Sequence, residues 1–292
     1  MYMVDRQWSM LSEMRSVMRE QAADIRGLRT DIKTMDARLA VRPRTVSPPK
    51  ESASTAKVAQ AAPETTGVSP ADAFARAHTL TTRPGYSPGD WLVRAIGVSL
   101  KTITPLVSSD KYSADVQDLV LDTLLVRNPQ TLEWQGLIAQ SWWVSDDGLT
   151  ITFRLRPDVR FSDGETLDAT DVAFTYNFIM NDDVAAPRHR AYLDKIAAVT
   201  PNGPHEVAFR FVEPYFDELS LAGTLPVLAE HFYGPYLEDP TKFNESKGLL
   251  LGSGPYRLSD PKSWTPDLGL VELERNPRYW GDVQPSYDRL LW

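Results

Sequence analysis

The stretch that decides the fold is LIAQSWWVSDDGLTITFRLRPDVRFSDGETLDATDVAFTY, residues 137–176. It contains Asp147-Gly148, a dipeptide typical of tight hairpin turns. After this turn, apolar and polar residues alternate with the period of a strand that has one buried face. The stretch therefore predicts an antiparallel hairpin. Its second strand alternates Leu149, Ile151, Phe153 and Leu155 with Thr150, Thr152, Arg154 and Arg156.

The second half of the same stretch predicts a helix. Residues 162–164 (Ser-Asp-Gly) are another turn signal, and Asp168 is a residue type that caps helices by accepting a backbone hydrogen bond. Asp171 falls in the first turn, where the helix dipole favours a negative charge. The helix is expected to begin at about Ala169. Its inner face carries Val172, Tyr176, Ile179 and Met180.

Shorter signals on either side extend this mixture of strands and helices. Apolar runs predict strands at residues 91–98, 207–211, 256–258, 270–274 and 288–292. Ser113 is expected to cap a further helix. One face of that helix carries Val116, Leu119, Val120 and Leu124. The fold class is therefore α/β.

Composition limits what the chain can do. It has 292 residues, 42% of them hydrophobic, and a formal net charge of −8. That sign disfavours a nucleic-acid partner, because proteins that bind nucleic acids carry a basic surface against the phosphates. The chain has no cysteine, which excludes disulfides, thiolate metal sites and cysteine nucleophiles.

The first 42 residues show a heptad pattern. Apolar residues recur at spacings of three and four, interrupted by Gln7 and Gln21. The two series are Val4, Leu11, Met18, Ile25, Ile32, Leu39 and Gln7, Met14, Gln21, Leu28, Met35. They predict a coiled-coil helix over residues 1–42 and self-association through it. A single amphipathic helix packed on its own domain is the alternative, although such a helix has a broader apolar stripe.

Residues 43–89 have a different composition. Proline recurs there among serine, threonine and alanine, with few large apolar residues. Such a segment buries too little apolar surface to offset the entropy lost on ordering. We therefore expect a disordered linker rich in Pro, Ser and Ala.

The sequence contains no pattern of catalytic or metal-ligating residues. Clustered carboxylates fall at turns and at a helix start, where Asp is common for structural reasons. They are Asp146, Asp147, Asp163, Glu165, Asp168 and Asp171. The four histidines, at positions 78, 189, 205 and 231, lack the spacing of metal ligands. We expect neither an enzyme nor a cofactor.

Several motifs, in order along residues 91–292, resemble a known family. They are ITPLVSSD (103–110), DLVLDTLLV (118–126), the stretch 137–176, VLAEHFY (227–233), GSGPYRL (252–258) and ERNPRYWG (274–281). Together they resemble the family 5 extracellular solute-binding proteins, the oligopeptide- and dipeptide-binding components of ABC importers. One departure is Asp168, which stands where the family has threonine and preserves the cap.

The resemblance implies a periplasmic-binding-protein-like type II lobe. The lobe would comprise residues 90–126 and 212–292, with an inserted subdomain at 127–211. Family members hold a peptide or another small solute in a cleft between two lobes and deliver it to an ABC transporter permease. A coiled-coil scaffold module that no longer captures a ligand is the alternative function.

The resemblance also implies candidate ligand-binding residues. The loop after ITP matches the first-lobe stretch that lines the cleft, and one subdomain tyrosine falls near a position that overhangs the ligand. The candidates are Ser108, Ser109, Asp110, Tyr112, Ser113 and Tyr192.

Two departures from the family lead to expectations about the gene. The family chain continues into a second lobe that is missing here, and no export signal follows Met1. We expect a periplasmic or extracytoplasmic protein from a truncated or split reading frame. A membrane anchor upstream of the heptad helix is a further expectation.

Overall fold

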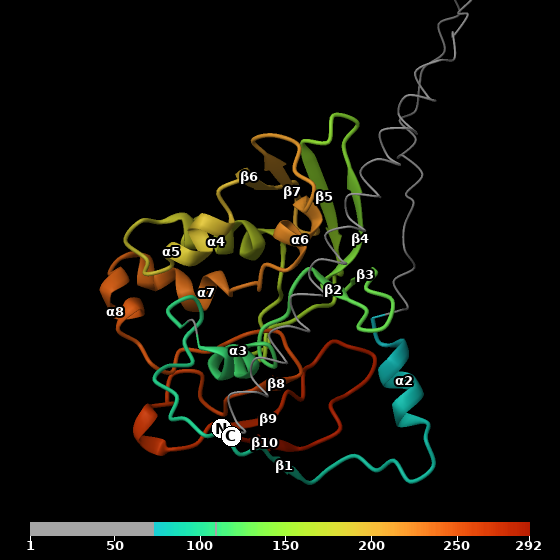
Figure 1. The fold of residues 1–292 in the computed structure, drawn as a ribbon, viewed down its shortest axis with the longest axis vertical. Coiled ribbons are helices and arrows are strands. Elements are labelled where there is room, and N and C mark those ends of the chain that lie inside the picture. The colour runs from blue at the N-terminus through green and yellow to red at the C-terminus, as the bar shows by residue number, and fades with distance from the viewer. Residues whose placement is uncertain (1–72, 109) are drawn as a thin grey trace, which may run out of the picture. The chain divides into compact units, whose positions relative to one another are not determined.

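The structure is a computed structural model that describes residues 73–108 and 110–292. The coiled coil expected at residues 1–42, and the linker up to residue 72, lie outside the described residues. The described part contains two four-stranded sheets and one two-stranded sheet, accompanied by short helices (Figure 1). The expected α/β fold class is thus confirmed.

The elements of the described part have the following bounds. The helices are α2 (Ala75–Thr81), α3 (Lys111–Gln117), α4 (Ala169–Met180), α5 (Pro187–Tyr192), α6 (Glu218–Gly223), α7 (Glu230–Tyr233) and α8 (Pro240–Asn244). The strands are β1 (Trp91–Val93), β2 (Leu125–Arg127), β3 (Trp134–Gly136), β4 (Ala139–Val144), β5 (Thr150–Leu155), β6 (Ile196–Pro201), β7 (Glu206–Phe211), β8 (Tyr256–Arg257), β9 (Glu272–Arg275) and β10 (Arg289–Leu291).

One four-stranded sheet is antiparallel and has the order β4-β5-β7-β6. Its first two strands are the expected hairpin, with Trp142 opposite Phe153. On the other side of β5 lies β7, which places Val207 opposite Phe153. Ile151, Phe153 and Leu155 are fully buried, so the alternating pattern marks the inner face of this strand correctly.

Helix α4 begins where the sequence predicts it. Asp168 Oδ1 accepts a hydrogen bond from the Thr170 N–H at 2.7 Å, and Asp171 Oδ2 accepts one from the Asp168 N–H at 2.9 Å. These bonds belong to a capping box. Asp171 Oδ1 also accepts from the Glu230 N–H at 2.9 Å, so the same carboxylate ties α4 to α7.

Replacing Asp168 with alanine tests this helix start. Because Asp168→Ala leaves N-terminal N–H groups of α4 without their acceptor, we expect a loss of about 1 kcal/mol in unfolding free energy. Urea denaturation measures it. Asp158→Ala, at an exposed loop position, serves as the control and is expected to change stability by less than about 0.5 kcal/mol. Equal losses in the two variants would contradict a capping role.

The other four-stranded sheet has the order β1-β10-β9-β8. β1 runs parallel to β10, with Trp91 opposite Arg289, whereas the other pairs are antiparallel. Strands were expected at all four places, but β1 ends at Val93 instead of reaching residue 98. β1 is an edge strand, and its three residues are 57%, 42% and 69% exposed.

The last part of the expected linker is ordered. Residues 75–81 form α2, although the composition of residues 43–89 predicted disorder throughout. Phe74 makes edge-to-face ring contacts with Tyr279 and Trp280, and the Tyr86 hydroxyl lies 3.0 Å from Ser286 Oγ. These contacts attach the segment to residues near position 280, although no residue of α2 itself is buried.

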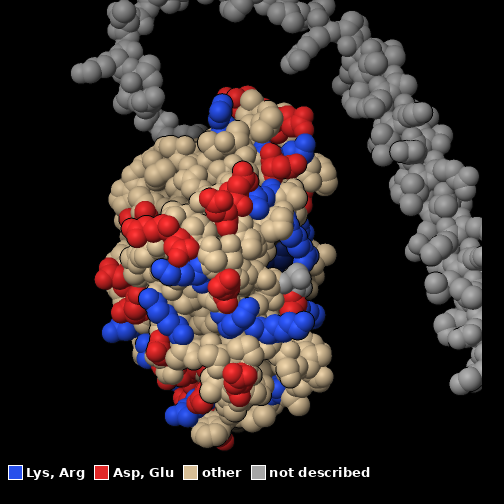
Figure 2. All heavy atoms as spheres, turned by 90° about the vertical axis from the view of Figure 1, so that its left-hand side faces the viewer, with Lys and Arg blue, Asp and Glu red and all other residues tan. Residues whose placement is uncertain are grey.

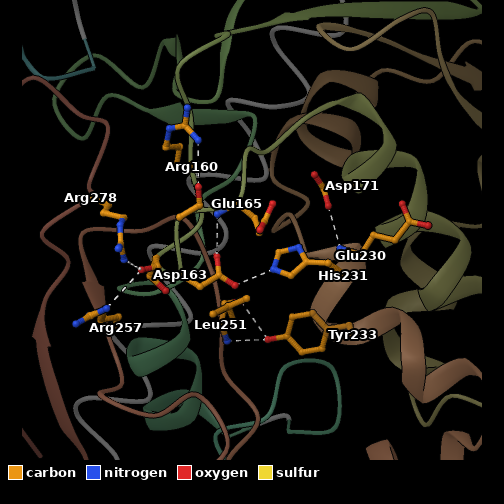
Figure 3. Close-up of polar contacts among 12 residues, drawn as sticks. Arg160, Asp163, Glu165, Asp171, Glu230, His231, Tyr233, Leu251, Arg257 and Arg278 are labelled. Carbon is orange, nitrogen blue, oxygen red and sulfur yellow. Dashed lines mark hydrogen bonds and ion pairs between the residues drawn. The ribbon is translucent and has the colours of Figure 1, made fainter.

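The turn 161–164 follows β5 and contacts loop residues near β8 and β9. The Ser162 N–H donates to the Gly252 carbonyl at 2.9 Å, and the Ser162 carbonyl accepts from Arg278 at 3.2 Å. Asp163 lies 2.8 Å from His231 of α7, and Figure 3 shows these two side chains pointing toward one another. The turn therefore fastens the β4–β7 sheet to the rest of the described fold.

Charged side chains are mixed on the surface. Figure 2 shows acidic and basic side chains interspersed over the face that it presents. The net charge of −8 is thus not gathered into a single acidic field on this face. Long-range steering of a strongly charged partner is not favoured by such a mixture.

Candidate functional site

Five of the six candidate ligand-binding residues fall within residues 102–113, the candidate segment, which ends inside the first turn of α3. The structure describes Ser108, Asp110, Tyr112 and Ser113, whereas Ser109 lies outside the described residues. Tyr112 is half-buried and Ser113 is buried. The segment connects β1 with α3, so its shape depends on how both of its ends are anchored.

The N-terminal end of the segment is held by side chains that sequence reasoning missed. Gln117 Nε2 donates to the carbonyls of Ile103 and Thr104, at 3.1 Å each. Thr104 Oγ1 accepts from the Leu249 N–H at 3.1 Å, and the Ile103 N–H donates to the Lys247 carbonyl at 2.8 Å. No sequence signal marks these partners, because each bond joins a side chain or backbone group to a backbone far along the chain.

Asp110, and not Ser113, caps α3. Asp110 Oδ1 accepts from the backbone N–H groups of Tyr112 at 2.7 Å and Ser113 at 3.1 Å. Ser113 lies inside the helix, where its hydroxyl donates to the Thr102 carbonyl at 2.7 Å. The helix also ends at Gln117, so the expected continuous face up to Leu124 is not formed. The N-cap prediction failed because serine and aspartate compete for the same role, and aspartate stands one turn earlier.

Between these anchors several main-chain groups have no partner among the described residues. Leu106 has a φ of 69°, in the left-handed region that a branched side chain rarely adopts, and its side chain is buried. Among the described residues, no group accepts from the N–H of Leu106 or Ser108. None donates to the carbonyls of residues 106–108. Backbone groups of this kind are satisfied by water or by a bound molecule.

The hydrogen bonds of the described candidate residues are structural. The side chains of Asp110 and Ser113 hold the segment in shape, and Ser108 Oγ accepts from the Asp110 N–H at 3.2 Å. The groups left without partners among the described residues are main-chain groups of residues 106–108. A main-chain surface recognises extended peptides or other ligands with regularly spaced donors and acceptors.

Charges beside the segment are paired. Lys111 Nζ lies 2.7 Å from Asp115, and Arg94 lies 3.7 Å from the same carboxylate. Burial raises the pKa of Asp118, and the negative charge of Asp115 raises it further. The site thus presents no isolated positive charge from these residues to a ligand.

The sixth candidate, Tyr192, lies in a different place. It is the last residue of α5 and lines a cavity of about 190 Å³. None of the residues of segment 102–113 lines this cavity. Tyr192 thus has a separate set of neighbours from the other described candidates.

A larger cavity of about 690 Å³ lies along the β1–β10 edge. Its walls come from residues 93–100, from the loop around Gly269, and from Leu291 and Trp292. Ser99 and Leu100 lie shortly before the candidate segment, but no candidate residue lines this cavity.

The described residues contain neither a cluster of metal-ligating side chains nor a helix suited to crossing a membrane. They contain no group of three or more His, Asp or Glu side chains able to hold a metal ion. None of their helices has the length and apolar character needed to cross a membrane.

The sequence of this chain matches a known protein family. The sequence profile of the "Bacterial extracellular solute-binding proteins, family 5 Middle" matches residues 133–292, more than half of the chain. The chain therefore belongs to family 5 of the bacterial extracellular solute-binding proteins. The resemblance seen in the sequence motifs is confirmed.

Curated relatives are longer than this chain. Protein XP55 of Streptomyces lividans is 33% identical over 198 residues, which cover 68% of this chain and 34% of XP55. The peptidoglycan-binding protein YepA of Agrobacterium fabrum is 31% identical over 179 residues, 60% of this chain and 27% of YepA. The chain thus spans about a third of the length of the curated relatives that it matches.

Solved structures share the fold. The oligopeptide-binding protein AppA of Bacillus subtilis, solved with a nonapeptide, is 26% identical with a TM-score of 0.56, over 70% of this chain and 40% of AppA. NikA of Brucella suis, solved with Fe(III)-EDTA, is 24% identical with a TM-score of 0.55, over 69% of this chain and 38% of NikA. At the latter identity only the fold is shown, and the two ligands differ in kind.

Proposed function

We propose that this chain supplies one lobe and the inserted subdomain of a type II clamp that captures a short peptide for import by an ABC transporter. The lobe is residues 90–126 and 212–292, and the subdomain is residues 127–211. The division is supported by the two separate sheets: β4 to β7 lie within the subdomain, whereas β1, β8, β9 and β10 lie in the lobe.

The main-chain groups of residues 106–108 that lack partners among the described residues carry this proposal. An extended peptide bound between two lobes pairs its backbone with the protein backbone, while its side chains occupy roomy pockets. Residues 106–108 offer donors and acceptors without partners among the described residues, on a segment whose two ends are anchored. Side-chain recognition of one particular solute does not require such a surface.

Among the solutes that family members take, peptides fit best. AppA was solved with a nonapeptide, and a relative of 28% identity is named probable peptide-binding protein YejA. Other structural neighbours were solved with Fe(III)-EDTA or agropinic acid, so the fold alone does not select peptides. The partners that follow from the proposal are a peptide and an ABC permease. The location is periplasmic or otherwise extracytoplasmic.

Calorimetric titration tests the function. We expect trialanine and tetra-alanine to bind the chain only weakly, because one lobe supplies only part of the contacts of a closed clamp, and we expect nickel–histidine and agropinic acid not to bind. Binding of either of these solutes without binding of the peptides would overturn the peptide assignment. Coiled-coil self-association through residues 1–42 remains part of the proposal and is measured separately by analytical ultracentrifugation.

The variant Ser108→Pro tests the role of the main chain. Proline removes the N–H of residue 108, so one hydrogen bond to the peptide is lost and we expect the Kd for trialanine to rise about fivefold to tenfold. Ser108→Ala is the matched control, because it keeps the N–H and loses only the hydroxyl. Equal Kd values for the two variants would show that this N–H makes no bond to the peptide.

A further inference from the structure

The loop between β6 and β7 carries an Asn-Gly dipeptide at positions 202 and 203. Gly203 has a φ of 106°, in the left-handed region that glycine adopts without strain. Residues 201–204, including both members of the dipeptide, are exposed. The Asn202 N–H donates to the Glu206 carbonyl at 2.8 Å and closes the loop at the ends of the two strands. The dipeptide is therefore held in a turn that water can reach.

The backbone nitrogen of Gly203 is not engaged in a hydrogen bond. Among the described residues, no group accepts from the Gly203 N–H. The two Asp-Gly turns differ in this respect, because the Gly148 N–H donates to the Ser145 carbonyl and the Gly164 N–H to the Phe161 carbonyl, at 2.9 Å each. An N–H that already donates must break that bond, at a cost of about 1 kcal/mol, before its nitrogen can react. The Gly203 nitrogen has no such bond to break within the described part of the chain.

The other asparagines are less suited to a reaction with the nitrogen that follows them. Asn128 and Asn276 precede prolines, which have no N–H. Asn177 and the residue after it lie inside α4, where backbone N–H groups are bonded within the helix. The N–H after Asn244 donates to a carbonyl of α8 at 3.0 Å. Asn181 is followed by an aspartate, whose Cβ crowds the nitrogen in a way that glycine does not.

We propose that Asn202 is a site of spontaneous deamidation. The Gly203 nitrogen attacks the side-chain carbonyl carbon of Asn202, so that a C–N bond forms and the Cγ–Nδ2 bond breaks. A proton moves from the Gly203 nitrogen to the departing nitrogen, which leaves as ammonia, and a cyclic succinimide remains. Water then opens the ring at one of its two carbonyls and leaves aspartate or isoaspartate at position 202. The inference does not rest on the proposed function, since this loop lies outside the candidate segment.

Deamidation changes the contacts of the loop. The side-chain amide of Asn202 donates from Nδ2 to Glu206 Oε1 at 3.3 Å. A carboxylate in its place has no proton to donate and repels the Glu206 carboxylate. Isoaspartate also adds a carbon atom to the main chain, which lengthens a loop whose ends are fixed by the pairing of Pro201 with Val207.

The same loop supports two neighbouring elements. The Pro204 carbonyl accepts from the N–H of Ala169, the first residue of α4, at 2.9 Å. The His205 carbonyl accepts from the N–H of Leu155, the last residue of β5, at 2.8 Å. A change at position 202 therefore reaches the start of α4 and the end of β5, and we expect it to lower the Tm.

Incubation of the 292-residue chain at mildly alkaline pH tests the site. Peptide mapping by mass spectrometry measures the deamidated fraction at each asparagine and separates aspartate from isoaspartate. We expect both products at position 202, in a fraction at least about fivefold above that at Asn244, where a hydrogen bond must first break. Asn181 is expected to fall below Asn202 as well. Equal fractions at the three positions overturn the proposal.

A synthetic peptide of residues 199–206, incubated in parallel, shows whether the folded loop protects its asparagine. Because no hydrogen bond within the described part holds the Gly203 N–H, we expect the folded chain to react within about fivefold of the peptide rate. The peptide also verifies that the conditions support the reaction. A folded chain that reacts more than about tenfold more slowly than the peptide, or not at all, overturns the proposal.

Variants measure the consequence of the modification. Asn202→Asp carries one of the two products, and we expect its Tm to lie about 2 °C below that of the wild type, as the loss of one exposed hydrogen bond provides. Adding Glu206→Gln removes the like charge and supplies an amide donor in the reverse direction, so most of the loss should be recovered. A wild-type Tm in Asn202→Asp overturns the role of Glu206 in the consequence, whereas peptide mapping decides the site itself.

Discussion

Gly252→Ala is expected to destabilise the fold by about 3 kcal/mol. Gly252 and Gly254 lie against the backbone at Val120, where the Gly254 N–H donates to the Val120 carbonyl at 2.9 Å. A Cβ at position 252 would overlap that carbonyl oxygen and press on the Leu121 side chain. Val120 and Leu121 are both buried, so neither can shift easily, and the strands that follow Gly252 would have to move instead.

Urea denaturation of the wild type, Gly252→Ala and Gly97→Ala measures this effect. Gly97 is the matched control, since a Cβ there has no atom within 4 Å and its backbone conformation does not require glycine. We expect Gly97→Ala to stay within about 0.5 kcal/mol of the wild type. If Gly252→Ala is as stable as Gly97→Ala, the close approach of the two backbones does not exist in solution.

Asp122→Asn is expected to change how stability depends on pH. Burial raises the pKa of Asp122 to about 6, even though its hydrogen bonds from Trp280 at 2.9 Å and Ser253 at 3.2 Å favour the carboxylate. The folded state therefore binds this proton more tightly than the unfolded state does. The stabilisation is complete below the unfolded pKa of 3.8 and is lost as the pH rises through about 6. A pKa difference of this size corresponds to about 3 kcal/mol.

The experiment compares unfolding free energies at pH 4 and pH 7.5. We expect the decrease between these values to be smaller in Asp122→Asn by up to about 3 kcal/mol, whatever the variant does to absolute stability. Part of the decrease should persist, because burial also raises the pKa of Asp171 to about 6.

Asp147→Asn is a control of opposite sign. Hydrogen bonds from the Ser145 hydroxyl and the Leu149 N–H lower the pKa of Asp147, so its contribution is lost toward acid pH instead of gained. An unchanged pH dependence in Asp122→Asn would refute a raised pKa for this carboxyl.

Local signals were sufficient for the hairpin and for α4. The Asp147-Gly148 turn, the alternating pattern of β5 and the cap at Asp168 each act over a few residues, and each is observed. β6 was not predicted. Its residues, IAAVTP, are mostly small and end in proline, and β6 forms through pairing with β7. The pair β2–β3 was missed for a similar reason.

The sequence singled out the candidate segment but not the bonds that hold it, and its role in ligand binding stays a prediction. The family motif located the segment before α3, whereas the bonds from Gln117 and to Thr104 Oγ1 depend on backbone positions that only the folded chain brings near. Tyr192 was singled out from the sequence, but its cavity needs Leu221, Leu225 and Pro226 as the opposite wall. Pairings between distant parts of a chain leave no local trace in its sequence.

The parallel pair β1–β10 determines when its sheet can form during synthesis. Trp91 leaves the ribosome almost 200 residues before its neighbour Arg289, so this sheet closes only after nearly all of the described chain has emerged. The β4–β7 sheet draws its strands from residues 139–211 and is complete much earlier. Pairs so distant in sequence form slowly. Synthesis therefore gives the β4–β7 sheet time to form before the sheet that contains β1 and β10 can close.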